Sequence, residues 1–551
     1  MTAALTPHIR RTLEPLHSAF PVLLGPGGGG RYRTVHIKLL FNRETCSPHT
    51  RTRTRQHVTM GSPPVTPKLN NPALFIAKGY INGEWLSTSQ SGKTFSVVNP
   101  STGASIAQLP EMDTREVHSA SDAASAAFKS FRKTSAKSRG QILRRWAELM
   151  HANAADLGTI LTLENGKPYA EAKGEIAFAA GYLEFYAGEA ERAYGDVIPP
   201  ANTANRILAI KQPIGVVACL APWNFPAAMI TRKAGAAIAA GCTTVVKPAG
   251  ETPLTALALA YLAEQAGLPA GVLNIVTSMA TLAEVGKALC EEPSIRKLSF
   301  TGSTAVGKLL MAQCAGTLKK LSLELGGNAP FIVFDDCDLD ATVNALMGAK
   351  IRNSGQTCVC ANRIYVQRGC YVELAERLVQ KFKELKTGDG FGEGVVVGPL
   401  TASRGVEKAQ RHVQDAVSKG GRLLHGGKPI DGSGYFFEPT VIADMAPNML
   451  SHDEEIFAPV AALYPFDTEE EVVELANNTD VGLGSYVCTN NIGRMWRVAE
   501  DLETGMVGVN TGVIAGGELP FGGVKQSGFG KEGGKWGVEE FMVTKCIVVA
   551  V

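Results

Sequence analysis

One cysteine of this sequence stands in surroundings that suit a reactive thiol. Cys358 follows the polar, glycine-containing segment Asn353–Thr357 and lies two positions before a second cysteine, Cys360. An unpaired cysteine is commonly a small packed residue of the core, where burial leaves its thiol inert. A polar flank with a glycine is unlike the flank of such a residue. The segment makes Cys358 a candidate nucleophile, and an inert core thiol remains the alternative on these residues alone.

A glycine-containing turn adds a second chemical signal. The segment Gly302–Gly307 (GSTAVG) follows a strand predicted at Ile295–Phe300 and opens a helix. The N-terminus of a helix offers free N–H groups and the positive end of its dipole to a pyrophosphate, and small residues allow close approach. The usual Gly-x-Gly-x-x-Gly fingerprint is absent after the first strand of this region, Ile214–Leu220. Alone, the turn fits a tight connection as well as a nucleotide site.

From about Gly79 to Val551 the chain resembles the aldehyde dehydrogenase family. The shared motifs stand in the family's order and are Ala221–Pro226 (APWNFP), Phe300–Ser303 (FTGS), Glu324–Gly327 (ELGG), Gly355–Cys358 (GQTC), Glu455–Phe457 (EIF) and Pro520–Gly523 (PFGG). The resemblance implies an α/β fold with a Rossmann-like dinucleotide-binding domain, an α/β catalytic domain and a small β oligomerisation element. It also implies oxidation of an aldehyde to a carboxylic acid with NAD or NADP.

The resemblance assigns three catalytic residues. Cys358 attacks the aldehyde carbon, and the side-chain amide of Asn224, together with the backbone N–H of Cys358, stabilises the thiohemiacetal oxyanion. Hydride transfer then leaves a thioester, and Glu324 activates the water that releases the acid. The alternative for Glu324 is a solvated carboxylate at a helix end, but Leu325–Gly327 after it completes a family motif.

The resemblance also implies the residues of a cofactor site. These are Pro222, Trp223, Lys247, Gly250, Gly302, Ser303, Val306, Glu455 and Phe457. Lys247 is expected to bind the adenosine ribose and Glu455 the nicotinamide ribose. Many NAD-selective relatives carry a glutamate three positions after this lysine, whereas Gly250 stands here and Glu251 follows it. An uncharged residue removes a repulsion toward a 2′-phosphate, so the choice between NAD and NADP stays open.

Two arginines near the predicted nucleophile indicate the kind of aldehyde. Arg232 follows Asn224 by eight positions, and Arg352 precedes Cys358 by six. Two guanidinium groups converging near the thiol would bind a carboxylate, although each could instead belong to a structural ion pair. With Cys358–Cys360 (CVC), they resemble the branch of the family that oxidises succinate semialdehyde. The expected partner is therefore a small-molecule aldehyde that carries a carboxylate.

Two details leave alternatives open. That branch commonly has a serine in the loop before Pro520, but Ala515–Gly517 stands here. A backbone N–H could replace the serine, or a longer substrate such as glutarate semialdehyde could fit better. Cys360 resembles a residue that forms a reversible disulfide with the catalytic thiol, and it is equally a small packed residue.

Three rival functions are disfavoured by the same residues. An acyl-CoA-forming relative does not need Glu324, and a thiol hydrolase does not need Lys247 or Glu455. An inactive structural homologue should have lost Cys358, Asn224 or Glu324, and all three are present.

The elements that must position these residues alternate between short apolar runs and Ala-rich stretches, which is typical of α/β proteins. A strand at Ile214–Leu220 is followed by a helix at Pro226–Ala240 and a strand at Thr243–Val246. Thr252 and Pro253 then start a helix as its N-cap and first residue. The remaining predicted elements are a helix end at Gly267, strands at Val272–Val276 and Phe331–Phe334, and a helix near Leu282–Leu289.

These elements predict four parts of the chain. They are a leader at 1–60, a cofactor-binding domain at 78–200 and 213–328, a catalytic domain at 329–517, and oligomerisation strands at 201–212 and 537–551. The apolar runs Arg206–Lys211 and Phe541–Val551 fit neither domain, and another subunit commonly covers such exposed edges. We expect a homodimer or homotetramer.

Composition excludes several classes of partner. The 551 residues are 45% hydrophobic, and 54 Lys+Arg against 52 Asp+Glu give a net charge of +2, which argues against nucleic acid or an anionic membrane as a partner. No apolar run reaches the roughly 18 residues of a membrane span. The eleven cysteines show no metal-ligand spacing, so no metal site and a reducing compartment are expected.

The first sixty residues differ from the rest in charge. They hold eight arginines and one lysine against Glu14 and Glu44 only. This bias resembles an organelle transit peptide, which predicts the mitochondrial matrix. The alternative is a cytoplasmic protein whose translation starts at Met60.

Overall fold

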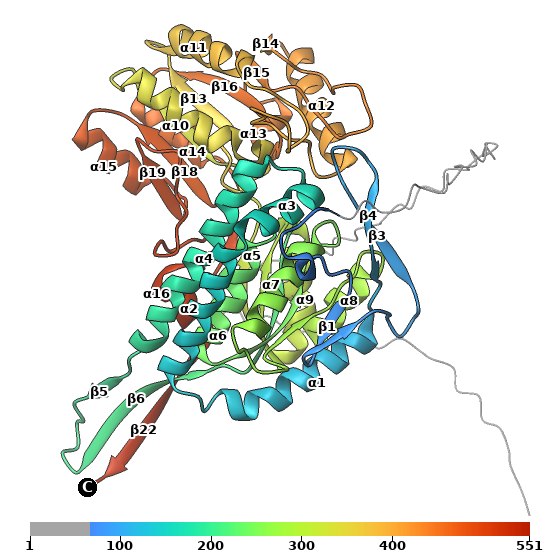
Figure 1. Cartoon of the computed structure of the whole chain (residues 1–551). Coiled ribbons are helices and arrows are strands. Elements are labelled where there is room, and N and C mark those ends of the chain that lie inside the picture. Colours follow the sequence, from blue (N-terminus) through green and yellow to red (C-terminus); the bar gives the residue numbers. More distant parts are fainter. Residues whose placement is uncertain (1–66) are drawn as a thin grey trace, which may run out of the picture. The chain divides into compact units, whose positions relative to one another are not determined.

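The computed structural model describes residues 67–551 of the chain, and the predicted leader at 1–60 lies outside the described residues. Figure 1 shows two sheets flanked by helices and a separate ribbon of long strands. The α/β class expected from the sequence is confirmed.

The first sheet has eight strands and carries the expected dinucleotide-binding topology. In their order across the sheet they are β2 (Glu84–Leu86), β1 (Gly79–Ile81), β9 (Leu273–Ile275), β8 (Thr243–Lys247), β7 (Val216–Leu220), β10 (Ile295–Thr301), β11 (Lys320–Glu324) and β21 (Gly528–Phe529). The five central strands, β9-β8-β7-β10-β11, are parallel. The chain runs outward from β7 to β9 and then returns to β10 on the other side of β7. The carboxyl ends of β7 and β10 are therefore the switch point at which open α/β sheets bind ligands.

Helices cover both faces of this sheet. They are α1 (Thr114–Phe131), α2 (Ala136–Ala152), α3 (Ala154–Asn165), α4 (Tyr169–Arg192), α5 (Ala228–Ile230), α6 (Ala236–Ala240), α7 (Pro253–Gln265), α8 (Leu282–Glu291), α9 (Thr304–Cys314) and α16 (Gly534–Glu539). Helix α7 begins at Pro253 after Thr252, as predicted, but the hydroxyl of Thr252 makes no capping hydrogen bond. Glu164 of α3 instead accepts from the N–H groups of Leu254 and Thr255.

The helix predicted at Pro226–Ala240 has an irregular centre. Between α5 and α6 the residues Thr231–Gly235 form a π-helical turn. Turns of this kind are uncommon and occur often at functional sites. This turn carries Arg232 and the buried Lys233 next to each other.

The second sheet has seven strands. In their order across the sheet they are β14 (Arg422–His425), β15 (Thr440–Ala443), β16 (Val460–Phe466), β13 (Arg363–Gln367), β12 (Pro330–Val333), β18 (Gly484–Cys488) and β19 (Met506–Val509). The helices that belong to this part are α10 (Leu339–Ile351), α11 (Tyr371–Lys383), α12 (Ser403–Ser418), α13 (Leu450–Asp453), α14 (Glu469–Asn477) and α15 (Ile492–Asp501). The side chains of its central strands are buried on both faces. The segment just before Cys358 directly follows α10.

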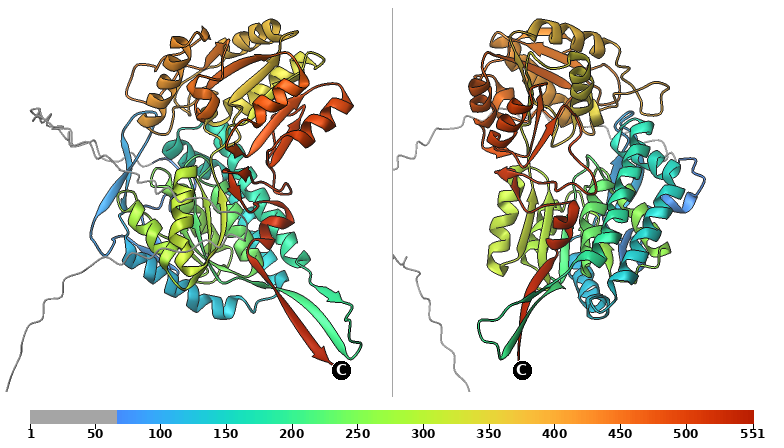
Figure 2. Two further views of the ribbon diagram at one scale, coloured as in Figure 1. Left: turned by 180° about the vertical axis from the view of Figure 1, so that it is seen from behind. Right: turned by 90° about the vertical axis from the view of Figure 1, so that its left-hand side faces the viewer.

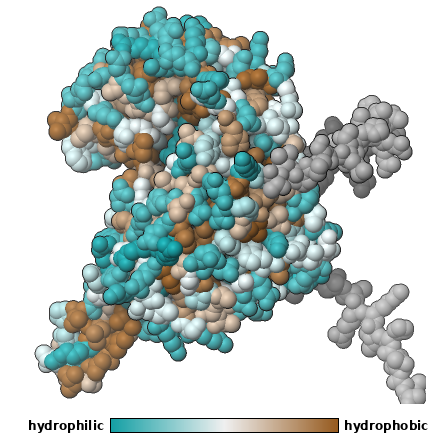
Figure 3. Space-filling model, in the orientation of Figure 1, coloured by the Kyte–Doolittle hydropathy of each residue, from teal (hydrophilic) through white to brown (hydrophobic). Residues whose placement is uncertain are grey.

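The two apolar runs that fitted neither domain pair with each other. In a three-stranded sheet β6 (Asn205–Pro213) lies between β22 (Met542–Ala550) and β5 (Asp196–Ile198), and all pairs are antiparallel. Figure 2 shows this sheet extending as an arm from the helices around it. Figure 3 shows apolar side chains gathered on the arm, where the exposed ones are Val197, Ile198, Val543, Ile547, Val548 and Val549.

Two short sheets complete the described strands. They are β3 (Thr94–Val98) with β4 (Ser105–Pro110), and β17 (Val481–Gly482) with β20 (Val524–Lys525).

Candidate active site

Cys358 lies where two cavities meet. The larger cavity, about 720 Å³, contains most residues of the predicted cofactor site, and its wall includes Pro222, Trp223, Asn224, Gly302, Ser303, Cys358, Glu455 and Phe457. The smaller cavity, about 40 Å³, is lined by Cys358, Arg232 and Arg352 together with apolar and aromatic side chains. The structure therefore brings the predicted nucleophile, cofactor residues and substrate arginines to one place.

The larger cavity opens at the switch point of the first sheet. Pro222 and Trp223 follow β7, while Gly302 and Ser303 follow β10 and lead into α9. The hydroxyl of Ser303 caps α9 by accepting from the N–H of Val306 at 3.4 Å. Trp223 and Phe457 meet edge to face, with ring centroids 5.6 Å apart. The strand-to-helix turn of the GSTAVG segment thus faces a cavity with an aromatic wall.

The backbone before Cys358 is held in an unusual conformation. Asn353 and Ser354 have φ values of 51° and 54°, in the left-handed region that non-glycine residues seldom occupy. Two contacts hold it there. The N–H of Asn353 donates to Glu171 at 2.7 Å, and the hydroxyl of Ser354 donates to the carbonyl of Gly398 at 2.9 Å. Strain at this point fixes the position of the nucleophile.

A buried network holds Asn224 beside Cys358. The amide of Asn224 donates to the carbonyl of Gln356 at 3.1 Å, which leaves its second N–H free for a ligand. The backbone carbonyl of Asn224 accepts from Lys167 and from the amide of Asn353, both at 2.9 Å. Lys167 is in turn paired with Glu175, and both side chains are buried.

The backbone N–H of Cys358 is the second available donor. It donates to no other residue among 67–551. The carbonyl of Cys358 packs against Gly327, where an added Cβ would lie only 2.4 Å from the carbonyl oxygen. Glycine is therefore required at this position of the ELGG motif, because any side chain would displace the nucleophile's backbone.

Glu324 ends β11 and is almost fully buried, not solvated at a helix end. Neither of its carboxylate oxygens has a hydrogen-bond partner among the described residues. Burial, together with the nearby charge of Glu532, raises the pKa of Glu324 well above its ordinary value. Burial and the charge of Glu455 likewise raise the pKa of Cys358 to about 12, although Arg232 opposes the shift. The thiol of Cys358 therefore holds its proton at neutral pH, and burial favours the protonated form of the Glu324 carboxyl.

Arg232 is partly engaged by the protein. Its Nε lies 2.9 Å from Glu532, and its guanidinium stacks 4.1 Å from the ring centroid of Phe521. One terminal nitrogen of this buried guanidinium has no hydrogen-bond partner within the described part of the chain. Arg232 thus forms a structural ion pair, which was one of the two alternatives for this residue. It also keeps one N–H group that can bind a ligand.

Arg352 is held without an ion pair. Its guanidinium lies over the rings of Phe178 and Phe225, 5.4 and 5.1 Å from their centroids. Across residues 67–551 no carboxylate lies within ion-pair distance of it. An arginine placed on two aromatic faces at the wall of a cavity is available to bind an anion.

The remaining predicted cofactor residues lie outside the wall of the larger cavity. Lys247 ends β8, its side chain is buried, and its ammonium has no hydrogen bond or ion pair with any described residue. Burial lowers the pKa of Lys247 to about 8, against the opposing charges of Glu251 and Glu111. Gly250 lies in the loop after Lys247, and the partly exposed Val306 lies in the first turn of α9. A buried, unpartnered ammonium at a strand end fits a ribose ligand.

Cys360 is buried and directs its thiol away from the cavities. Its Sγ lies 3.7 Å from the carbonyl of Lys350 and 3.8 Å from that of Ala361. Both Cys358 and Cys360 are free thiols. A disulfide between them stays a prediction, and it requires the loop to move.

Sequence reasoning missed Lys233 and Glu532. The ammonium of Lys233 binds Glu532 and also donates to Thr301 at 2.6 Å. Burial by itself raises the pKa of the Glu532 carboxyl. The charges of Lys233 and Arg232 outweigh it, so the pKa of Glu532 lies below its ordinary value. The pair joins residues 299 positions apart, so no local pattern reveals it. The only signal was the direct succession of two basic residues in an otherwise apolar helix.

Two kinds of feature are absent from residues 67–551. No cluster of His, Cys, Asp and Glu side chains could hold a metal ion there. Within the same residues no helix is long and apolar enough to cross a membrane.

Comparison with known proteins identifies relatives over nearly the whole described chain. The model of the aldehyde dehydrogenase family matches residues 85–547. A glutarate-semialdehyde dehydrogenase of Pseudomonas putida is 52% identical over 88% of this chain and 100% of its own length. A mitochondrial succinate-semialdehyde dehydrogenase of Arabidopsis thaliana is 49% identical over 95% of this chain and 96% of its own. The crystal structure of an NADP-dependent enzyme of Escherichia coli, 50% identical, covers 88% of this chain and 100% of that chain with a TM-score of 0.86.

Proposed function

This chain belongs to the aldehyde dehydrogenase family, and within that family we propose that its substrate is a short aldehyde with a terminal carboxylate, in the first place succinate semialdehyde. It is an enzyme that oxidises an aldehyde with NAD or NADP. The product is then succinate, as in the degradation of 4-aminobutyrate. The observation that carries the substrate proposal is the pair Arg232 and Arg352 in the wall of the small cavity at Cys358.

The two arginines suit one carboxylate. Within residues 67–551 Arg352 has no ion-pair partner and is oriented by two aromatic rings, while one nitrogen of Arg232 has no hydrogen-bond partner there. Elsewhere the small cavity is lined mainly by apolar and aromatic side chains, which suits a short methylene chain between carboxylate and aldehyde. A charge-assisted bidentate contact at the far end would place the aldehyde carbon at the thiol.

Glutarate semialdehyde is the second candidate. Ala515 lines the small cavity and brings no hydroxyl donor there, which favours a longer substrate. The Pseudomonas putida relative, at 52% identity, carries that activity in its name.

The residues around Cys358 suggest how each chemical step is served. The second N–H of the Asn224 amide and the free N–H of Cys358 would bind the oxyanion that forms when the thiol adds to the aldehyde. A bound nicotinamide cofactor supplies the acceptor for the hydride. Glu324 would then take a proton from water as that water attacks the thioester.

The protons of Cys358 and Glu324 must leave before these steps. Each pKa is raised chiefly by burial. The protonated thiol of Cys358, with a pKa of about 12, dominates at neutral pH, and the shift at Glu324 favours its protonated carboxyl. The positive charges of Arg232 and Lys233 act in the opposite direction at Glu324. The rate should therefore rise with pH above neutrality.

Each residue of the proposed cofactor site suits one part of a dinucleotide. Trp223 and Phe457 would flank the nicotinamide, Glu455 would hold its ribose, and Lys247 the adenosine ribose. The turn at Gly302, Ser303 and Val306 would receive the pyrophosphate at the start of α9. Pro222 lines the cavity, and Gly250 adds no charge of its own at the ribose edge.

We propose a separate role for each predicted part of the chain. The segments 78–200 and 213–328 would bind the cofactor, and 329–517 would carry Cys358. The strands within 201–212 and 537–551 would pair with a second subunit, because the arm they form exposes apolar residues. A homodimer or homotetramer follows.

Import into the mitochondrial matrix is proposed for the first sixty residues. The alignment with the mitochondrial Arabidopsis relative covers 521 residues and so extends into them, whereas that with the Pseudomonas relative covers 484. Import assays with and without residues 1–60 test this, and a cytoplasmic product in both cases would favour a start at Met60.

The substrate proposal is tested by absorbance at 340 nm with succinate semialdehyde, glutarate semialdehyde and butanal. Butanal is the matched control, because it has the chain length of succinate semialdehyde without the carboxylate. Arg352→Leu should raise KM for the two semialdehydes by about tenfold or more, since charge-assisted hydrogen bonds contribute roughly 1.5–3 kcal/mol. Its kinetics with butanal should stay the same. Preference of the wild-type enzyme for butanal would contradict the proposal.

A further inference from the structure

An ion pair crosses from one α/β part of the enzyme to the other beside the predicted adenosine ribose site. Glu251, two residues before α7, binds Arg404, the second residue of α12. The guanidinium also belongs to the wall of the larger cavity, together with Trp223 and Ser303. No motif of the sequence indicated Arg404.

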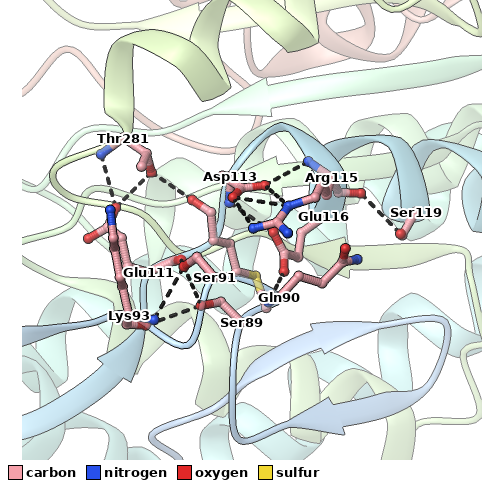
Figure 4. A network of polar contacts seen from close by, with 11 residues as sticks. Ser89, Gln90, Ser91, Lys93, Glu111, Asp113, Arg115, Glu116, Ser119 and Thr281 are labelled. Carbon is pink, nitrogen blue, oxygen red and sulfur yellow. Dashed lines mark hydrogen bonds and ion pairs between the residues drawn. The ribbon is translucent and has the colours of Figure 1, made fainter.

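Gly250 cannot carry the glutamate that many NAD-selective relatives have there. A Cβ at Gly250 would lie 2.6 Å from the sulfur of Met279 and 2.9 Å from the carbonyl oxygen of Ser278. Glu111 fixes this neighbouring loop, because its carboxylate accepts from the N–H groups of Met279 and Thr281 at 2.9 and 3.0 Å. Figure 4 shows Glu111 and Thr281 within this network. The acid of the loop after β8 is therefore Glu251.

The negative charge of Glu251 is neutralised by Arg404, a residue of the cavity wall. Glu251 also favours the charged form of the buried Lys247, which has no partner of its own among the described residues. The side chain of Arg404 is 63% exposed, so its bond to Glu251 is screened by solvent and easily exchanged. Lys247 and Arg404 thus place two cations near one carboxylate at the ribose edge.

We propose that Arg404 is a cofactor-specificity residue, which cancels the repulsion of Glu251 and binds the 2′-phosphate of NADP. A guanidinium binds a phosphate dianion bidentately and more strongly than it holds a carboxylate through one contact. The inference concerns cofactor affinity alone and goes beyond the aldehyde proposed above, so either can fail without the other.

The test measures binding without an aldehyde. Isothermal titration calorimetry compares adenosine 2′,5′-bisphosphate with 5′-AMP, which differ only in the 2′-phosphate. Arg404→Gln should weaken the bisphosphate by about tenfold and change the affinity for 5′-AMP less than twofold, since one charge-assisted contact is lost. Glu251→Gln should strengthen the bisphosphate, because the repulsion disappears.

Arg411→Gln is the matched control. Arg411 lies on the same helix and the same cavity wall, but it is paired with Glu454. If Arg411→Gln weakens the bisphosphate as much as Arg404→Gln does, general charge and not a specific contact determines affinity, and the proposal is wrong. Equal weakening of both ligands by Arg404→Gln would also overturn it. Melting temperatures of the variants check that each is folded.

Discussion

Glu175→Gln is expected to lower both the stability and the turnover of the enzyme. Glu175 and Lys167 form an ion pair whose side chains are 1% and 0% exposed, so solvent does not screen it. A glutamine could still accept from the N–H of Ala227, as Glu175 does at 2.9 Å, but its amide group would face the ammonium. Removing one partner of a buried pair costs about 3–5 kcal/mol, because the other charge stays buried without compensation.

The turnover falls because Lys167 also holds Asn224. Its ammonium donates to the backbone carbonyl of Asn224 at 2.9 Å, and the amide of Asn224 is the proposed oxyanion donor. Complete loss of such a donor costs roughly 3 kcal/mol of barrier, or about a hundredfold in rate. A displaced Lys167 should produce part of this loss and leave KM nearly unchanged.

A double variant separates stability from catalysis. Lys167→Met with Glu175→Leu removes both charges, and replacing a buried pair by apolar residues is often neutral. The free energy of unfolding in urea should therefore return toward the wild-type value. The kcat should stay low, because the carbonyl of Asn224 no longer accepts a hydrogen bond from residue 167. The exposed pair of Glu373 and Arg377 supplies the control, since Glu373→Gln should change neither property. Wild-type turnover in the double variant would refute the positioning of Asn224 by Lys167.

Four further outcomes follow from the structure. Gly327→Ala should lower kcat by about a hundredfold, as the new Cβ displaces the Cys358 carbonyl; an unchanged rate would show that the loop adapts. Burial raises the pKa of Glu455 to about 8, so its contribution to stability is present below pH 4.5 and is lost as the pH rises toward 8. Unfolding curves of Glu455→Gln should therefore fall less over that range than those of the wild type. On the arm, Ile547→Asp should yield smaller assemblies in analytical ultracentrifugation. Peroxide inactivation that dithiothreitol reverses should disappear in Cys360→Ser, and equal sensitivity would exclude a disulfide with Cys358.

The sequence predicts elements well where the signal is local. The strand at Ile214–Leu220 and the helix start at Pro253 correspond to β7 and α7 because a buried β-branched run and a proline act within a few residues. The carboxylate that caps α7 comes from Glu164, about ninety positions earlier. No short window of sequence contains both groups, so the sequence predicts Thr252 alone as the cap.

The candidate site is likewise predictable from the sequence only where the signal is local. Asn224 and Cys358 are predictable because each lies in a motif of its own, and the topology brings those motifs to one cavity. The obstacle to a side chain at Gly250 is a loop after β9, and the partner of Glu251 is on α12. Both depend on packing between distant segments, so the residue types around Lys247 could not predict them.

The same long-range packing makes the two substrate arginines unequal. Arg232 shares Glu532 with Lys233. The charges of these two cations oppose the raised pKa of Glu324, whereas the charge of Glu532 adds to it. Removing Arg232 therefore has two effects. The substrate carboxylate loses a ligand, and Glu324, the proposed base, loses a nearby cation, so the oxidation of every aldehyde should be affected. Arg352 has no ion pair of this kind among residues 67–551, where its guanidinium lies over two aromatic rings. The preference for a carboxylated substrate should accordingly reside in Arg352, while Arg232 would couple substrate binding to the protonation of Glu324.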